Sequence, residues 1–370
     1  MMSVLFVQKR AHRAGAQTCL ARLLRHRAMR NRAVLLCSQS GWLTDECAEI
    51  PAVIEPFPSS RSLAGRLFQN SNFARRVKDK LARLGLKPAI VHANDHLEGL
   101  LGLKLAERLD AHSAIFLRSP GMTRDDYFKY RCNEFDLIAA VGDELRDRAK
   151  GWDQAREIQL IHDGICESEF APPKPKAAAF PKKILVIGSP LDWKGWADVT
   201  EALALLERDN ALPETEFDFT GAAPDPAKND LKLEQLQKAR CRFLGRVEKF
   251  RELILGYDLV INPSRMESFG MAAVEVVALG VPLLSSRTGI IEQVIEQPEF
   301  LFSPKQPAEL ACALRNLIQN WPRLDFDAER CQRRIREKFI IGRAVERLGA
   351  AYEALLRQKG KPVSRPPEIQ

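Results

Sequence analysis

The chain has 370 residues, of which 45% are hydrophobic and 28% are charged, and its net charge is +8. This length is enough for two domains of ordinary size, and the composition is that of a globular protein. No apolar run is long enough to cross a bilayer, and the short apolar stretch at residues 1–7 is followed at once by basic residues, which excludes a typical signal peptide. The sequence therefore predicts a cytoplasmic protein.

The first half of the chain predicts strands that alternate with helices. Apolar residues recur at helical spacing over residues 16–29 and 97–109, and short apolar runs of strand length separate these segments. Such alternation is typical of a mostly parallel sheet covered on both faces. The expected strands are residues 4–7, 33–37, 89–92, 114–117, 137–141 and 157–161.

A proline-rich segment at residues 171–181 interrupts this pattern and predicts a linker and hinge. The alternation then restarts, so the chain is expected to fold as two doubly wound α/β domains, residues 1–170 and 182–340. The tail at residues 359–370 is expected to be disordered. The expected second-domain elements are strands at 183–187, 216–220, 259–262 and 281–285, and helices at 196–206, 269–279, 328–339 and 342–357.

The positive charge of the chain is concentrated in its N-terminal part. Residues 1–94 carry 16 Lys or Arg and five Asp or Glu, a balance of +11, so the remaining residues carry −3. Such a basic face attracts anionic lipid, nucleic acid or an acidic substrate, or it is simply a solvated surface.

The eight cysteines form no C-x-x-C pair, which argues for reduced thiols and against a disulfide framework or a zinc site. They are Cys19, Cys37, Cys47, Cys132, Cys166, Cys241, Cys312 and Cys331.

The most informative motif lies between two predicted strands of the second domain. Asn262 ends a strand, Glu267 and Gly270 lie in a tight turn, and Glu275 follows Glu267 by eight residues on a helix. The start of that helix offers free N–H groups to a diphosphate, and a glycine allows a ligand to approach the backbone. Carboxylates at both ends of the motif are strong acceptors for vicinal hydroxyls. Without this context, the two glutamates would be a first-turn residue and a surface residue.

This motif resembles the E-x(7)-E signature of retaining glycosyltransferases with the GT-B fold, particularly family 4, the glycosyl transferases group 1. The resemblance extends over most of the chain. It includes Val186–Gly188 with Lys194–Gly195, then Phe219–Gly221, Phe243–Gly245 and Tyr257–Asp258, together with Gly15 in the first domain and the closing helix that contains Tyr352. The resemblance implies two Rossmann-like domains with a central cleft, and a helix at 341–358 that packs back on the N-terminal domain.

The resemblance also implies roles for individual residues. Glu275 would bind the donor's ribose, Glu267 the transferred sugar, and Lys194 the departing diphosphate, although Lys194 has an alternative as a surface lysine. Gly15 would face the diphosphate, or it is a simple turn glycine. The donor site would also include Gly188, Ser189, Ser268, Phe269, Gly270 and Met271. No protein nucleophile is required for retention.

Two positions depart from the family pattern. Ser189 stands where the family commonly has an arginine, and Arg118, followed by Ser119, stands where it often has a histidine. Arg118 would contact the donor sugar or replace the lost cation, or it is structural. These departures leave two alternatives open: a sugar-nucleotide epimerase on the same fold, and a non-catalytic scaffold that binds a partner or polysaccharide.

Two further groups of residues are candidates for an acceptor site and for a metal site. His92, His96 and Ser119 are candidates for the acceptor side, although a strand-end or helix-cap network is the favoured interpretation of the histidines. Asp325 and Asp327 form a D-x-D pattern, which is interpreted as a helix cap, and no metal is expected.

The basic segment of the N-terminal domain is expected to dock a peripheral enzyme on an anionic membrane, where it would glycosylate a glycan or lipid-linked acceptor. Nucleic acid is not expected as a partner. The segment contains Arg61, Arg66, Phe68, Phe73, Arg75, Arg76, Lys78, Lys80, Leu81, Arg83 and Leu84.

Overall fold

The computed structural model describes residues 3–58, 63–225, 231 and 233–357. The chain divides into two compact units, each with its own sheet. The first unit contains the chain up to Val141, then Leu145–Gly164 and the residues from Ile341 on. The second contains Gly142–Glu144 and Ile165–Ile340.

The described part of the first unit contains a seven-stranded parallel sheet in the order β3-β2-β1-β4-β5-β6-β7. Its central strands are continuous apolar runs and are wholly buried, as expected for a sheet that is covered on both faces. The strands are β1 (Val4–Gln8), β2 (Ala33–Cys37), β3 (Ala52–Ile54), β4 (Ile90–Ala93), β5 (His112–Leu117), β6 (Leu137–Ala140) and β7 (Gln159–Leu160).

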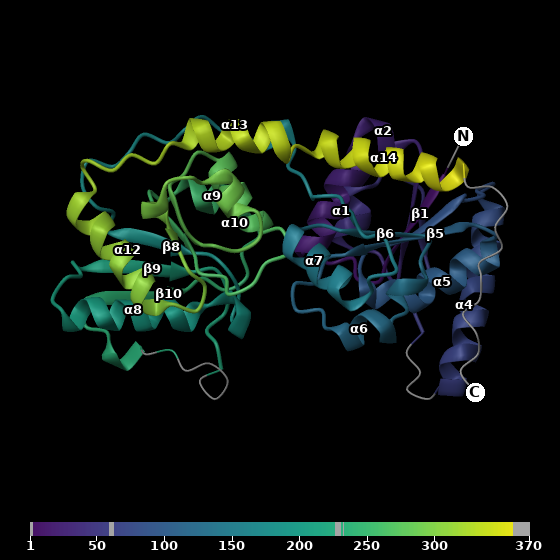
Figure 1. The fold of residues 1–370 in the computed structure, drawn as a ribbon, viewed down its shortest axis with the longest axis horizontal. Helices are drawn as coiled ribbons and strands as arrows, with labels where there is room; N and C mark the ends of the chain where they lie inside the picture. Colours follow the sequence, from purple (N-terminus) through teal and green to yellow (C-terminus); the bar gives the residue numbers. More distant parts are fainter. Residues whose placement is uncertain (1–2, 59–62, 226–230, 232, 358–370) are drawn as a thin grey trace. The chain divides into compact units, whose positions relative to one another are not determined.

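Figure 1 shows α1 (Gly15–Arg25) and α14 (Ile341–Arg357) on one side of this sheet, and α4 (Leu63–Arg83) and α5 (Gly99–Leu109) on the other. The closing helix of the chain thus belongs to the first unit, as the family resemblance implies. Shorter helices connect the strands. They are α2 (Arg27–Arg30), α3 (Trp42–Glu46), α6 (Arg124–Lys129) and α7 (Asp143–Trp152).

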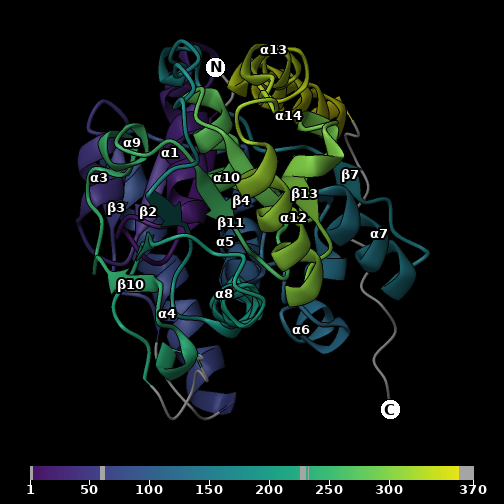
Figure 2. The same ribbon diagram turned by 90° about the vertical axis from the view of Figure 1, so that its left-hand side faces the viewer.

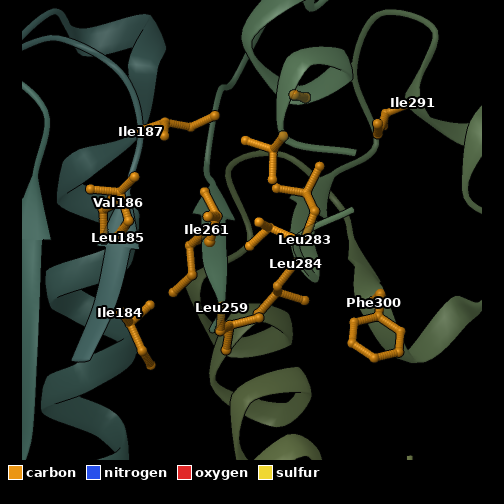
Figure 3. Close-up of a cluster of buried hydrophobic side chains, with 14 of the residues drawn as sticks. Ile184, Leu185, Val186, Ile187, Leu259, Ile261, Leu283, Leu284, Ile291 and Phe300 are labelled. Carbon is orange, nitrogen blue, oxygen red and sulfur yellow. The ribbon is translucent and has the colours of Figure 1, made fainter. Parts of the chain in front are cut away.

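The second unit repeats the plan with a six-stranded parallel sheet in the order β10-β9-β8-β11-β12-β13. Figure 3 shows side chains of neighbouring strands packed together in its core, among them Val186, Ile261 and Leu284. The strands are β8 (Lys183–Val186), β9 (Thr215–Phe219), β10 (Ala239–Phe243), β11 (Val260–Asn262), β12 (Leu283–Ser286) and β13 (Leu301–Phe302).

Helices cover both faces of this second sheet. Figures 1 and 2 both show α8 (Trp196–Arg208) beside α12 (Pro307–Asn320), and α10 (Met271–Ala278) packs against α13 (Ala328–Lys338). Two shorter helices, α9 (Phe250–Leu255) and α11 (Ile291–Val294), complete the unit. The two-domain α/β fold class predicted from the sequence is therefore confirmed.

The structure corrects several boundaries. The helix expected over residues 16–29 is interrupted at His26, whose ψ of 133° is extended and whose ring accepts a hydrogen bond from the Ala28 N–H. The helix expected from Phe269 begins at Met271, because Gly270 has a φ of 89° and is not helical. The strand expected over 157–161 is only Gln159–Leu160. The strands β3, β10 and β13 and several helices, among them α4, α7 and α12, were not predicted.

The segment expected to be a linker, residues 171–181, is counted with the second unit. The N–H groups of Ala171 and Lys174 donate to the carbonyls of Ala278 and Gly280, and the Trp321 indole donates to the Ala177 carbonyl. Pro173 lies so close to Gly280 that a side chain at Gly280 would collide with it. The expected tail at 359–370 lies outside the described residues. Within the described residues, no helix has the length and apolar character needed to span a membrane.

Candidate active site

The candidate site of the second unit lies at the carboxyl ends of β8 and β11. The sheet order places these two strands side by side, although α8, β9, β10 and α9 separate them in sequence. The strand order reverses between them, and such a switch point is where open α/β sheets bind ligands. The loop after β8 carries Gly188, Ser189 and Lys194, and the loop after β11 carries Glu267.

Lys194 and Glu267 meet at this edge as an ion pair. The Lys194 Nζ lies 2.5 Å from the Glu267 Oε1, and their side chains are 24% and 16% exposed. The Ser264 hydroxyl donates to the same Glu267 oxygen at 2.8 Å. The two residues that the sequence assigns to the leaving group and the transferred sugar are thus brought together, 73 residues apart in the chain.

The two loops are fastened to each other by Arg265. Its guanidinium contacts both oxygens of Asp198 at 2.6 and 2.8 Å and one oxygen of Asp192 at 2.5 Å. Hydrogen bonding to Asp198 raises the pKa of Arg265. Gly195 has a φ of 68° and lies against the Pro263 carbonyl, where a Cβ would come within 2.0 Å. Only glycine fits this position, because a side chain would force the loops apart.

The start of α10 is open toward this edge. Gly270 forms the N-cap with a φ of 89°, no side chain caps the helix, and no acidic residue lies in its first turn. A Cβ on Gly270 would meet no atom closer than 3.9 Å, so neighbouring atoms leave room at this position. The first-turn N–H groups and the helix dipole therefore favour an anion here.

The other predicted donor-site residues around the start of α10 differ in how far their side chains are buried. Glu275 and Met271 are half-buried on α10, and Ser268 is buried in the turn before it. The Phe269 ring packs into the core against Phe339, so only its backbone is available to a ligand.

Gly188 and Ser189 follow β8. Gly188 has a φ of 138°, and it exchanges hydrogen bonds with the Thr220 hydroxyl through both its N–H and its carbonyl. A Cβ there would lie 3.0 Å from the Trp196 indole nitrogen. Ser189 is half-buried, and its carbonyl accepts from the Leu191 N–H.

In the first unit, Arg118 is enclosed by protein groups. Its Nη1 lies 2.6 Å from both Asp163 oxygens, its Nε donates to the Asn94 side-chain oxygen, and its guanidinium lies over the Phe116 ring. Burial lowers the pKa of Arg118, but the Asp163 carboxylate outweighs this effect and the pKa is raised. The side chain predicted to be catalytic is therefore part of a buried ion pair.

His92 lies within β4 and not at the strand end. It is fully buried between Phe6 and Phe116, and its Nδ1 is 2.5 Å from the Tyr352 hydroxyl on α14. Burial, together with the nearby Arg118, lowers the pKa of His92 well below its usual value. The ring is therefore neutral and serves the packing of α14 against the sheet.

His96 and Ser119 converge on Asp95, a residue that was not singled out from the sequence. Asp95 caps the turn that follows β4: it accepts from the His96 N–H at 2.7 Å, contacts the His96 Nδ1 at 2.8 Å, and accepts from the Ser119 hydroxyl at 2.6 Å. Burial lowers the pKa of His96, but the hydrogen bond to Asp95 raises it above the usual value. The three side chains form a helix-cap network at the carboxyl edge of the first sheet.

Two further residues at these edges were missed by sequence reasoning. Glu98 is buried, accepts from the Lys9 N–H at 3.2 Å, and has a pKa raised by burial to about 7. Its spacing from Asp95 is that of a capping box, which is the signal that would have drawn attention to it. Arg265 lies between Asn262 and Glu267, but its role depends on Asp198, which is distant in sequence and which the fold brings near.

At the start of α1, Gly15 is the first helical residue, and a Cβ there would meet no atom within 4 Å. Packing therefore does not require a glycine at this position. The helix has no side-chain cap and no acidic residue in its first turn. Its N-terminus therefore offers unpaired backbone donors to an anion.

The D-x-D pattern is a helix cap, as predicted. The Asp327 carboxylate accepts from the Arg330 N–H at 3.0 Å at the start of α13, while Asp325 forms an ion pair with Lys176 at 2.9 Å. Across the described ranges, no three His, Cys, Asp or Glu side chains gather as a metal site would require.

The sequence of the chain is similar to those of known glycosyltransferases. Residues 167–338 match the family model of glycosyl transferases group 1. The chain is 28% identical over 224 residues to the glycogen synthase of Mycobacterium tuberculosis, a match that covers 58% of this chain and spans about half of that relative, 52% of its length. It is 23% identical over 289 residues to the lipopolysaccharide core biosynthesis mannosyltransferase LpsB of Rhizobium meliloti, covering 72% of this chain and 79% of LpsB.

Among solved structures, the Anabaena protein Alr3699/HepE in complex with UDP and glucose superposes with a TM-score of 0.76. The superposition covers 96% of this chain and all of that chain at 17% identity, so it is evidence for the shared fold. Residues 167–338 thus match the glycosyl transferases group 1, and the chain has the GT-B fold.

Proposed function

We propose that the protein transfers a sugar from a nucleoside-diphosphate sugar to an acceptor hydroxyl with retention of the anomeric configuration. The observation that carries this proposal is the Lys194–Glu267 ion pair, which lies at the switch point of the second sheet beside the open start of α10. A cation, a carboxylate and free backbone donors are the groups that a diphosphate and a sugar require at one place.

The proposed roles follow the positions of the residues. Glu275 accepts from the ribose hydroxyls and Glu267 from a hydroxyl of the transferred sugar. The first-turn N–H groups of α10, with Gly188 and Ser189 in the facing loop, hold the diphosphate. Lys194 stabilises the negative charge that grows on the departing phosphate, an interaction that is strongest in the transition state.

The chemistry needs no nucleophile from the protein. The bond between the anomeric carbon and the phosphate oxygen breaks, and the acceptor oxygen bonds to the same face of the sugar. The acceptor's proton passes to the phosphate oxygen that has left. The two electrons of the broken bond remain on the nucleoside diphosphate, so charge and protons balance.

The finer assignments are a UDP- or GDP-sugar as donor and a glycan or lipid-linked acceptor, in cell-surface polysaccharide or lipopolysaccharide synthesis. UDP and glucose in the Alr3699/HepE structure support the donor class, and LpsB supports the acceptor class. No metal is proposed to take part.

Membrane docking is proposed through charge alone. Among the described side chains, the expected apolar side of α4 is not exposed: Phe73 and Leu81 are buried in the first unit's core, and Leu84, just after the helix, is exposed. Glu55 binds two of its cations, Arg76 at 2.6 Å and Lys80 at 2.8 Å. Arg61 and the side chains of Arg66 and Phe68 lie outside the described residues.

Calorimetric titration with UDP, GDP and ADP, and with their common sugar conjugates, tests the proposal. Binding of one nucleotide is expected in the wild type and is expected to weaken at least tenfold in Glu275→Ala, since a charge-assisted hydrogen bond is lost. Glu201→Ala, an exposed glutamate of α8, is the matched control and should bind as the wild type does.

The other results would each point to a different function. Consumption of a sugar nucleotide without any acceptor would indicate the epimerase. Absence of nucleotide binding in folded protein would contradict the proposal and leave the non-catalytic scaffold.

A further inference from the structure

An exposed tryptophan lies on the loop that carries Lys194. Trp193 is 41% exposed, and Leu191, two residues before it, is 43% exposed. Between them, the Asp192 side chain is 80% exposed. One short turn therefore exposes part of an indole side chain, a carboxylate and an aliphatic side chain to solvent.

This turn is held in place at many points. The Trp193 carbonyl accepts from the Arg265 N–H at 2.8 Å, and the Leu191 carbonyl accepts from the Lys194 N–H at 2.8 Å. Arg265 also binds Asp192 through its side chain. An apolar group on an anchored loop binds a partner without a large ordering cost, because its backbone is already fixed.

The anchors also place Trp193 at one end of the E-x(7)-E motif. Its backbone bonds to Arg265, two residues before Glu267, and the next residue, Lys194, contacts Glu267 itself. The opposite end of the motif, at Glu275, is the one proposed for the ribose. Trp193 therefore lies near the transferred sugar, where an acceptor hydroxyl must arrive.

We infer that Trp193 is a stacking platform for a sugar ring of the acceptor, with Asp192 accepting hydrogen bonds from that ring's hydroxyls. This inference rests on the proposed function. One face of a pyranose presents C–H groups that pack on an aromatic ring, while its rim presents hydroxyls, so a sugar matches an indole beside a carboxylate. A lipid chain would match Leu191 and Trp193 but would gain nothing from the carboxylate between them.

The test observes Trp193 directly in the full-length protein. The chain has five tryptophans, so 5-fluorotryptophan labelling should give five ¹⁹F resonances, and Trp193→Phe identifies the relevant one. The added compounds are UDP or GDP alone, and then methyl α-glucoside, methyl α-mannoside, methyl β-galactoside and maltotriose with the nucleotide present. The Trp193 resonance is expected to shift with at least one sugar and not with nucleotide alone.

Kinetics with the same sugars provide the second readout. Trp193→Ala is expected to raise the acceptor KM about tenfold, whereas Trp193→Phe retains most of the affinity, and neither changes nucleotide affinity. Trp152→Phe, in the first unit, is the control and should leave both constants unchanged.

A shift of the Trp193 resonance with nucleotide alone, or no shift with any of the four sugars, would overturn the inference. If calorimetry shows nucleotide binding in that same sample, the proposed function survives this failure. A sugar-induced shift in protein that binds no nucleotide would support the platform while contradicting the transferase.

Discussion

The two sheets have the same strand order, except that the first has one more strand at one edge, yet the residues at their carboxyl ends are chemically different. In the first unit, the Arg118–Asp163 pair is 5% and 11% exposed and its remaining contacts are with protein groups. In the second, the Lys194–Glu267 pair is 24% and 16% exposed and lies beside an uncapped helix. The same topology therefore holds a buried cation, Arg118, at the carboxyl edge of one sheet and a partly exposed cation, Lys194, at that of the other.

The largest expected effect is the loss of the buried pair. Arg118→Met leaves the Asp163 carboxylate buried without its partner, which should cost about 3–5 kcal/mol of unfolding free energy. Urea unfolding measures this cost. Arg131→Met, which removes an exposed pair with Glu134, is the control and should cost less than about 1 kcal/mol. A change at Arg118 as small as the control's would remove the distinction between the two edges.

Breaking the Lys194–Glu267 pair should affect catalysis more than stability. Lys194→Met is expected to lower kcat about 100-fold, because a group that stabilises the leaving charge is lost, while the unfolding free energy changes by less than about 1 kcal/mol. Lys249→Met, at an exposed pair with Glu252, should change neither quantity. A Lys194 variant with full activity and a large loss of stability would reverse the assignment.

A smaller effect concerns pH at the first edge. Burial raises the pKa of Glu98 to about 7, so between pH 4.5 and 7 the folded protein holds a proton that the unfolded chain has released. The stabilisation is fully present below pH 4.5 and is lost as the pH rises from 4.5 to 7, by roughly 3 kcal/mol.

Glu98→Gln should flatten this part of the pH profile of unfolding free energy. Glu107→Gln, at an exposed glutamate, should keep the wild-type slope. If wild type and Glu98→Gln have parallel profiles, Glu98 does not hold the proton.

The smallest expected effect separates the two aspartates of the D-x-D pattern. Asp327→Ala removes the cap of α13 and should cost about 1 kcal/mol in thermal or urea unfolding. Asp325→Ala, whose ion pair is exposed, should cost less than about 0.5 kcal/mol. Equal losses, or a rise in Tm on adding Mn²⁺ that either variant abolishes, would argue for a metal site instead of a cap.

The sequence predicts the strands of the first sheet well, because a strand such as β2 is buried on both faces and is therefore a continuous apolar run. It predicts the second edge for a related reason: Asn262, Glu267 and Gly270 are neighbours along the chain, so the loop is visible as a motif. Helix α4 was missed because most of its residues are polar, and in its described part the residues that face the core, including Phe73 and Val77, form a narrow stripe.

The first edge could not be predicted, because its partners are distant in sequence. Arg118 and Asp163 are separated by 45 residues, and no local pattern indicates which acid neutralises a given arginine. The position of His92 shows the same limit. A histidine at the end of an apolar run is equally compatible with an exposed strand end and with the interior site that it occupies under α14.

The return of α14 to the first unit has a consequence for biosynthesis. Tyr352 and its partner His92 are 260 residues apart, so the first sheet is synthesised long before the helix that covers it. At about 5–20 residues per second, roughly 13–50 s pass between the two, during which the second unit emerges complete. The unit that is synthesised first is thus the last to complete its fold. Until α14 is made, the apolar surface that it covers is exposed, and the ribosome or a chaperone must shield this surface from contact with other chains.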